Sequence, residues 1–255
     1  MISKVHPFQK KWGQNFLSDT NLLDRIVRTV DPQPTDSILE IGPGDGSLTE
    51  KIFPIVKEMA TIEIDPLLIK HLSIRSDLKG LHIVHGDVLL QDIEAMPIKN
   101  PVRVIGNIPY NITSPIIFWL IEQLDFWNDA FIMMQKEVGE RLTAEVGTKA
   151  YSRISVVVGV YLDVEMCFKI PPDVFYPKPK VDSAILRFTK KENPIVPDDQ
   201  FVKFNKIVKT AFSKRRKMLR NSLSGFDICD EIKDEIDFTR RPEALSIEEF
   251  AKLLT

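Results

Sequence analysis

Short apolar runs alternate with helix-length amphipathic segments along most of the chain. The runs span residues 37–41, 60–64, 81–84, 102–105 and 130–134. Continuous apolar character in so short a run is typical of strands that are buried on both faces. Because helices separate these strands, the pattern predicts an α/β fold with a parallel sheet, right-handed crossovers and helices on both sides.

Three further segments complete this part of the chain. Residues 22–30 carry apolar side chains at helical spacing after Ser18 or Asp19 as a cap, which predicts a helix. Residues 154–161 are ambiguous, because their β-branched content favours a buried strand while their length also suits a core helix. Residues 181–188 alternate and are predicted to form the last strand of the sheet.

The chain changes character near residue 190. Residues 190–200 contain Pro194, Pro197 and several charges, which is typical of a linker. Beyond it, residues 201–223 and 247–254 are amphipathic at helical spacing. We therefore predict two domains, a ligand-binding α/β domain over 1–190 and a small α-helical domain over 197–255.

Length and composition indicate how large a hydrophobic core the chain can form and in which compartment it is expected. The 255 residues are 44% hydrophobic, enough for one large core and a small appended domain. We find no apolar run near the roughly 18 residues that cross a bilayer, and expect a soluble cytoplasmic protein without a membrane partner. Cys167 and Cys229 lie far apart, without a second cysteine or a histidine nearby at ligand spacing, so we expect two buried thiols, no disulfide and no metal site.

The net charge of −2 conceals a strong asymmetry. Residues 178–220 hold about thirteen Lys or Arg against four acids, whereas residues 227–249 hold about nine acids against three bases. A nearly neutral protein can carry a basic surface, so the net charge does not exclude a nucleic-acid partner.

A glycine-rich phrase follows the first predicted strand. Gly42, Gly44 and Gly46 stand where the backbone must turn sharply and admit a ligand. The spacing G-x-G-x-G, with Glu40 and Asp45 nearby, departs from the dinucleotide fingerprint, because these carboxylates oppose a pyrophosphate and suit a cationic sulfonium. The alternative is a glycine turn in some other α/β protein.

Carboxylates also end the next two predicted strands. Glu63 comes about twenty residues after the loop, where an acid can accept both hydroxyls of a ribose. Asp87 can accept the amino group of an adenine ring. Each acid alone suits a solvated strand end, but their joint position at the ligand-binding edge of the sheet predicts a nucleoside cofactor.

The fourth predicted strand runs into Asn107-Ile-Pro-Tyr110. The N6 lone pair of adenine is delocalised into the ring, so its methylation needs acceptors that draw on the amine hydrogens. The Asn107 amide oxygen and the Ile108 carbonyl suit this role, with Pro109 fixing the turn. Tyr110 suits stacking on an extruded adenine. The alternative is an Asx-type turn with a buried tyrosine.

These motifs together resemble the ribosomal RNA adenine dimethyltransferase family over nearly the whole chain. The resemblance rests on Gly13-Gln-Asn-Phe-Leu17, the glycine loop, Glu63, Asp87, the turn at Asn107, Phe175-Tyr-Pro-Lys-Pro-Lys-Val-Asp-Ser183, residues 211–223 and Arg241-Pro-Glu-Ala-Leu-Ser246. It implies a Rossmann-like fold that uses S-adenosyl-L-methionine and dimethylates two adjacent adenosines near the 3′ end of small-subunit RNA.

The resemblance also implies roles for single residues. Asn15 and Leu17 are expected to close over the cofactor, and Gly42 and Gly44 to approach its methionine part. Glu63 is expected to bind its ribose and Asp87 its adenine, while Asn107 contacts both cofactor and target base. Phe175 corresponds to a second aromatic contact to that base, and residues 152–161 are expected to be helical.

Basic residues indicate where RNA is expected to bind. Lys214, Arg215, Arg216, Lys217 and Arg220 are predicted to lie on successive turns of a helix and to contact phosphates. Lys178 and Lys180 are expected to border the catalytic cleft near Phe175. The alternative is a well-solvated helix face. The expected partner is small-subunit RNA or an immature small subunit, bound by a monomer.

Three other functions remain open. A DNA adenine methyltransferase and a large-subunit ribosomal RNA methyltransferase share the Asn-x-Pro-aromatic turn, although the C-terminal motifs favour the small-subunit family. The third is a ribosome-assembly factor in which methyl transfer is secondary.

Overall fold

The computed structural model describes residues 15–17 and 19–254, which fall into two compact units. The first unit comprises the described residues up to Lys136 together with Glu165–Thr189. The second comprises Glu137–Val164 and the described residues from Lys190 onward. Residues 137–164 therefore pack with the C-terminal helices, although the sequence suggested a division near residue 190. Which unit binds cofactor and which binds RNA stays a prediction at this point.

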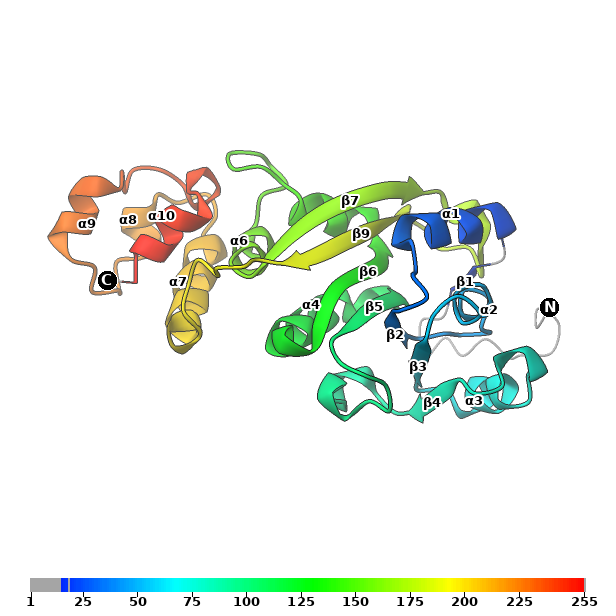
Figure 1. Cartoon of the computed structure of the whole chain (residues 1–255). Helices are drawn as coiled ribbons and strands as arrows, with labels where there is room; N and C mark the ends of the chain where they lie inside the picture. The colour runs from blue at the N-terminus through cyan, green and yellow to red at the C-terminus, as the bar shows by residue number, and fades with distance from the viewer. Residues whose placement is uncertain (1–14, 18, 255) are drawn as a thin grey trace. The chain divides into compact units, whose positions relative to one another are not determined.

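A mixed sheet forms the centre of the first unit (Figure 1). Among the described residues its seven strands follow the order β4-β3-β2-β5-β6-β9-β7. Their bounds are β2 Ser37–Ile41, β3 Glu58–Glu63, β4 His82–His85, β5 Val102–Asn107, β6 Trp127–Gln135, β7 Leu162–Ile170 and β9 Ser183–Lys190. The predicted runs 37–41, 60–64, 81–84, 102–105, 130–134 and 181–188 all fall on strands. The first matches its strand at both ends, and the ends of the others differ by at most three residues.

The direction of one strand corrects the expected parallel sheet. β2, β3, β4, β5 and β6 pair in parallel, but β9 runs antiparallel to β6. Hydrophobic periodicity cannot reveal this, because it depends on burial and not on direction. The parallel part has the Rossmann order, in which the chain reverses its progress across the sheet between β2 and β5. Ligands bind in the crevice at the carboxyl ends of strands at such a point.

Helix α1 (Thr20–Val30) confirms the first predicted helix. The Asp19 carboxylate caps it by accepting the Leu22 N–H at 2.8 Å. It ends at Asp31, whose φ of 49° is left-handed and whose N–H donates to the Val27 carbonyl. The apolar side chains three and four positions apart are the buried ones: Leu23, Ile26 and Val30.

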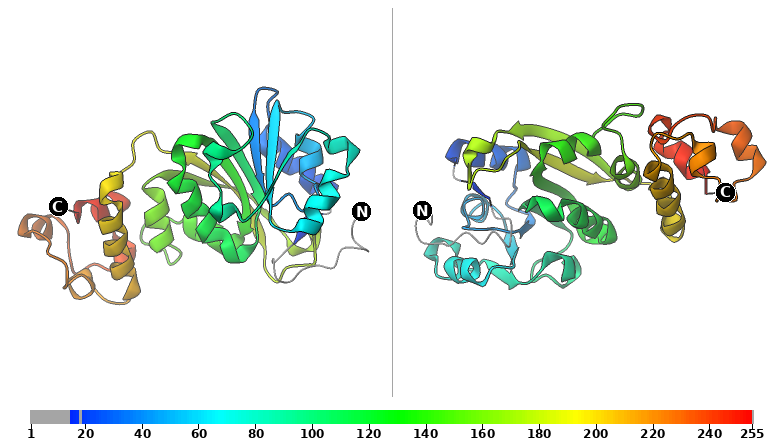
Figure 2. Two further views of the ribbon diagram at one scale, coloured as in Figure 1. Left: turned by 90° about the horizontal axis from the view of Figure 1, so that it is seen from below. Right: turned by 180° about the vertical axis from the view of Figure 1, so that it is seen from behind.

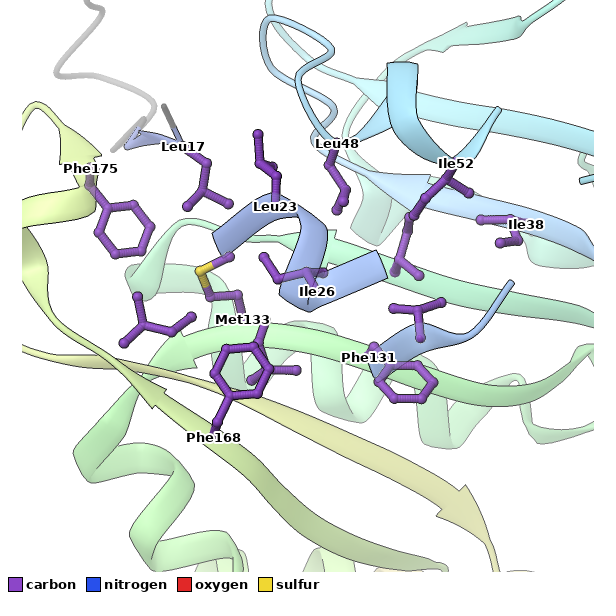
Figure 3. Packing of buried hydrophobic residues seen from close by; sticks show 14 of the residues in the cluster. Leu17, Leu23, Ile26, Ile38, Leu48, Ile52, Phe131, Met133, Phe168 and Phe175 are labelled. Carbon is purple, nitrogen blue, oxygen red and sulfur yellow. The ribbon is translucent and has the colours of Figure 1, made fainter. Parts of the chain in front are cut away.

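The buried face of α1 packs on the sheet in one hydrophobic cluster (Figure 3). Residues from β2, β3, β5, β6, β7 and β9 contribute to it, and so does α2 (Thr49–Ile52). Helix α4 (Thr113–Glu122) lies on the other side of the sheet (Figures 1 and 2). Helix α3 (Pro66–Ser73) connects β3 to β4 and begins at the cap Asp65. The helices packed on both sides of the sheet thus fix the positions of its strand ends, where the predicted ligand-binding residues lie.

The ambiguous segment is a helix. Helix α6 spans Arg153–Gly159, which decides the ambiguity at 154–161 for a helix, as the family resemblance implied, and against the strand that its β-branched residues favoured. Ser152 and Ser155 form a capping box at its start. Val156, Val157 and Val158 are all buried, so packing outweighs their β-branched preference for a strand.

A two-stranded ribbon pairs the first described residues with residues 175–176. β1 (Phe16–Leu17) pairs antiparallel with β8 (Phe175–Tyr176), with Phe16 opposite Tyr176 and Leu17 opposite Phe175. Leu17 and Phe175 are buried and belong to the cluster around α1. The ribbon thus joins two motifs that are more than 150 positions apart.

The second unit is helical, as expected for the tail of the chain. Its remaining helices are α5 (Lys136–Leu142), α7 (Phe201–Ser213), α8 (Leu219–Ser222), α9 (Asp230–Glu235) and α10 (Ile247–Lys252). The expected continuous helix over 201–223 is wrong, because α7 ends at Ser213. The N–H groups of Leu219 and Arg220 donate to the carbonyls of Arg240 and Phe238, which directs the chain out of the helical path.

The two cysteines are more accessible than the sequence suggested. Cys167 is half-buried and Cys229 is exposed, so the expectation that both thiols are buried is wrong; both are free. Over residues 15–17 and 19–254, no helix is long and apolar enough to cross a membrane, and no group of three metal-binding side chains gathers.

Candidate active site

The glycine loop lies at the end of β2 and has the backbone that its sequence predicts. Gly42, Gly44 and Gly46 have φ values of 65°, 61° and 84°, which side-chain-bearing residues rarely adopt. A Cβ added at Gly44 would lie 3.2 Å from two carbons of the Phe16 ring. The loop therefore needs glycine for its conformation and, at Gly44, for the close approach of β1.

A cavity of about 260 Å³ opens at this loop. It lies at the carboxyl ends of β2, β3, β4 and β5, where the Rossmann topology places a ligand. All seven residues predicted to bind the cofactor line it: Asn15, Leu17, Gly42, Gly44, Glu63, Asp87 and Asn107. Phe16 and Asn111 also line the cavity, although sequence reasoning assigned them no role.

Glu63 is held in place by backbone N–H groups. Its carboxylate accepts the N–H of Ile64 and of Asp65 at 2.9 Å and that of Gly44 at 3.3 Å. Burial raises the pKa of Glu63, and these hydrogen bonds oppose the rise. The bonds fix the carboxylate at the cavity wall, where Oε2, which accepts only the long 3.3 Å bond from Gly44, has acceptor capacity left for a ribose hydroxyl.

Glu40 is a second buried acid at the cavity. Its carboxylate accepts a hydrogen bond of 2.6 Å from the Thr49 hydroxyl. The pKa of Glu40 is raised from 4.5 to about 7, mainly because burial removes water from the carboxylate. The Thr49 hydrogen bond opposes this rise, and the nearby charges of Glu63 and Asp45 contribute to it. A bound cation would favour the ionised form, so this wall suits a positively charged sulfonium compound.

Asp87 follows β4 and caps the turn after it. One carboxylate oxygen accepts the Leu89 N–H at 3.0 Å. The half-buried side chain also lines the cavity. A carboxylate at this point suits the amino group of an adenine ring. The acids at the ends of β3 and β4 thus meet in one site.

The orientation of the Asn107 amide follows from one contact. Its Nδ2 group donates to the backbone carbonyl of Asn15 at 2.8 Å. Because a carbonyl can only accept, the amide nitrogen must face Asn15, and Oδ1 lies on the other side of the amide group. Pro109, with φ of −58°, stiffens the turn that follows. Asn107 thus offers an acceptor at the cavity.

The two aromatic residues predicted to hold the target base differ in exposure. Tyr110 is half-buried, outside the cavity lining, and its hydroxyl lies 2.6 Å from the Ser183 hydroxyl. Phe175 is only 4% exposed and lies beside Leu17 at one end of the cluster around α1 (Figure 3). In this structure core residues cover its ring, and its contact with a base stays a prediction.

The basic residues after α7 form a turn instead of helix faces. Lys214, Arg216 and Lys217 are exposed within residues 214–217, which we call the basic turn. Arg220 is exposed on α8, so the expected spacing on successive helical turns is wrong.

Arg215 differs from its neighbours in the basic turn. It is half-buried and donates to the Lys149 carbonyl at 2.7 Å. Its guanidinium also lies 3.8 Å from the Glu243 carboxylate. Arg215 therefore holds the basic turn to the loop of Lys149. This lysine, alone in its loop, carried no sequence signal.

The cations near Phe175 are also exposed. Lys178 pairs with Asp173 on the surface. Lys180 makes no ion pair with any residue that the structure describes. Their predicted contact with RNA stays a prediction.

The fold and the cavity define a methyltransferase that uses S-adenosyl-L-methionine. The family model for ribosomal RNA adenine dimethylase matches residues 5–254, and the chain belongs to this family. A relative from Syntrophotalea carbinolica, ribosomal RNA small subunit methyltransferase A, is 43% identical over 97% of this chain and 96% of its own.

Two solved structures are similar over almost the whole chain. A dimethyladenosine transferase from Plasmodium falciparum has a TM-score of 0.80 and 28% identity, covering 93% of this chain and 95% of its own. The 23S rRNA methyltransferase ErmE has a TM-score of 0.73 and 27% identity, covering 94% of this chain and 98% of its own. The similarity of fold therefore extends over nearly the whole chain.

Proposed function

We propose that this enzyme transfers methyl groups from S-adenosyl-L-methionine to the N6 amine of adenosines in small-subunit ribosomal RNA. The observation that carries the proposal is the fixed orientation of the Asn107 amide at the cavity, with its nitrogen on the Asn15 carbonyl. The family and the 43% identical relative support RNA as the substrate. Two adjacent adenosines near the 3′ end are the proposed targets, each methylated twice.

The residues at the cavity suit the poor nucleophilicity of the adenine amine. When bound, S-adenosyl-L-methionine supplies an electrophilic methyl group. Asn107 Oδ1 and the Ile108 carbonyl are proposed to accept the amine hydrogens, two in the first transfer and the one that remains in the second, which favours a pyramidal nitrogen with a localised lone pair. The methylated nitrogen then releases one proton to water, because an N-methylated adenine ammonium is strongly acidic. No strong base is required beside it.

Two aromatic residues are proposed to hold the base. Tyr110 stacks on one face of the extruded adenine, and Phe175 serves the other face once its ring is uncovered. Stacking on an aromatic side chain contributes about 1–3 kcal/mol per base.

The second unit is proposed to bind the RNA backbone. Its basic turn offers exposed cations without a partner in the described chain, which suits phosphates on a shaped RNA surface. Lys149 extends this surface through the Arg215 contact. We propose that residues 1–190 bind the cofactor and residues 197–255 the RNA, with 137–164 contributing Lys149. A monomer acting on an immature small subunit is the proposed form.

The test is methyl transfer from radiolabelled cofactor to purified small subunits that lack the modification, followed by mapping of the label. We expect label on adenosines near the 3′ end of the small-subunit RNA. Large subunits and duplex DNA serve as competing substrates. Label on either of them instead would overturn the assignment of the substrate.

An Asn107→Ala variant separates catalysis from a role in ribosome assembly. Removing one preorganised polar group is expected to lower methyl transfer at least ~100-fold. Binding to immature small subunits should persist, because the cations proposed to contact RNA phosphates lie on other segments of the chain. Retained methylation would contradict the proposed chemistry.

A further inference from the structure

A single side-chain contact links the catalytic turn to the last strand of the sheet. The Tyr110 hydroxyl and the Ser183 Oγ are 2.6 Å apart, although the residues are 73 positions apart in the chain. Ser183 belongs to β9 and closes the motif that begins at Phe175. None of the roles proposed above uses this serine.

Ser183 is a rigid partner. Its side chain is fully buried, and its backbone lies opposite Gln135 in the β6–β9 pair. The preceding residue, Asp182, is held twice by Lys136, through the Lys136 N–H at 3.0 Å and the ammonium group at 2.9 Å. The Ser183 hydroxyl therefore has a fixed position relative to the sheet.

Tyr110 is held less firmly. It opens a short 3₁₀ turn (Tyr110–Ile112), and its backbone carbonyl accepts the Thr113 hydroxyl at 3.1 Å. Its side chain is half-buried, so the ring is only partly enclosed by neighbours. The contact between its hydroxyl and the Ser183 hydroxyl restrains the far end of the ring. Burial also raises the pKa of Tyr110, which keeps the phenol protonated and able to donate.

A hydroxyl pair of this kind can serve stability alone, by satisfying two buried polar groups. The location of this pair beside the catalytic turn favours a role in orienting the Tyr110 ring as well. Tyr110 follows directly on the Asn107-Ile-Pro turn, and a ring that stacks on a base must hold its plane to within about 10–20°. A rotated ring would misplace the base relative to the Asn107 amide, and small misplacements of a reacting group are costly.

We propose that Ser183 is a positioning residue that fixes the plane of the Tyr110 ring against the target adenine. The inference rests on the proposed function. Ser183 acts only through Tyr110 and does not itself touch the substrate. Losing the hydrogen bond should lower kcat while leaving both RNA and cofactor binding unchanged, because phosphates and the cavity supply most of the affinity.

The test is a double-mutant cycle with Ser183→Ala, Tyr110→Phe and the double variant. Steady-state methylation of small subunits lacking the modification gives kcat and KM, and titration of S-adenosylhomocysteine gives its Kd. We expect each single variant to lower kcat about three- to tenfold, the range for one net hydrogen bond. The double variant should match Tyr110→Phe, because both changes remove the same bond. KM and Kd should stay within about twofold.

Thr61→Val is the matched control. Thr61 lies in β3, is fully buried, and its hydroxyl has no hydrogen-bond partner in the described chain. It tests the loss of a buried hydroxyl from the same sheet without a link to Tyr110. Its kcat should equal that of the wild type. If Ser183→Ala does not fold, Tyr110→Phe still tests the bond, since it removes only one oxygen atom.

Three results would overturn the proposal. An unchanged kcat in Ser183→Ala or Tyr110→Phe would mean that the bond does not position the ring. If the two reductions in kcat multiplied in the double variant, Ser183 would act independently of Tyr110. If the Kd of S-adenosylhomocysteine rose together with the fall in kcat, the role of the bond would be purely structural. Wild-type enzyme that fails to methylate small subunits would instead overturn the proposed function, and this inference with it.

Discussion

Replacing the buried acid at the cavity should separate stability from cofactor binding. In Glu40→Gln the amide oxygen still accepts the Thr49 hydrogen bond, but the charge is lost. Raising the Glu40 pKa from 4.5 to about 7 corresponds to roughly 3 kcal/mol. Because the folded-state pKa is raised, the folded protein holds the Glu40 proton more tightly, and stability falls as pH rises from about 4.5 to 7.

The variant should therefore be more stable than the wild type, and only at high pH. At pH 8 the wild type carries an ionised buried carboxylate, so Glu40→Gln should gain up to about 3 kcal/mol in the free energy of unfolding. At pH 5 the gain should be under about 1 kcal/mol. Urea denaturation of the cofactor-free protein at both pH values measures this difference. Glu122→Gln, on an exposed position, is the control and should change neither value.

Cofactor binding should change in the opposite direction. At pH 8 the ionised Glu40 faces a cationic ligand, so Glu40→Gln should weaken S-adenosyl-L-methionine binding about tenfold or more. In the wild type, about one Glu40 in ten is ionised at pH 6, which should weaken binding roughly tenfold relative to pH 8. The variant should lack this dependence, while titration of the ligand's own amine affects both proteins equally. A variant that is less stable at pH 8, or that shows the wild-type pH dependence, would refute the reasoning.

Two further changes test the loop and the basic turn. Gly44→Ala should cost about 1–2 kcal/mol of stability through its left-handed φ and should weaken cofactor binding by displacing Phe16. Gly147 also has a left-handed φ of 84°, but a Cβ added there would meet no atom within 4 Å beyond its chain neighbours. Gly147→Ala should therefore lower stability by backbone strain alone in calorimetry and leave cofactor binding unchanged in titration. Alanine at all three exposed cations of the basic turn should flatten the salt dependence of RNA binding by about two units or more. Arg215→Ala should instead lower stability, and an unchanged salt slope in the triple variant would exclude phosphate contacts there.

The site could be predicted from sequence largely because its parts are local. The glycine loop, Glu63, Asp87 and Asn107 each follow a strand directly, and parallel strands bring their carboxyl ends to one edge. Once the strands were located, the meeting of these residues in one cavity followed from topology. The contact of Asn107 with Asn15 did not, because it joins residues 92 positions apart through a backbone carbonyl.

Errors arose where tertiary packing decides local structure. Burial on every side makes Val156–Val158 helical despite their branching, and contacts to residues 238 and 240 end the helix before the basic turn. Strand β7 (Leu162–Ile170) was not predicted, although its alternation of apolar and charged residues is a usable signal. The antiparallel course of β9 leaves no trace in periodicity.

A crystal structure with S-adenosylhomocysteine tests the central claim most directly. We predict the ligand in the cavity at the glycine loop, its ribose hydroxyls on the Glu63 carboxylate and its sulfur facing Asn107 Oδ1. A ligand bound elsewhere, or an Asn107 amide whose nitrogen faces the sulfur, would contradict the account.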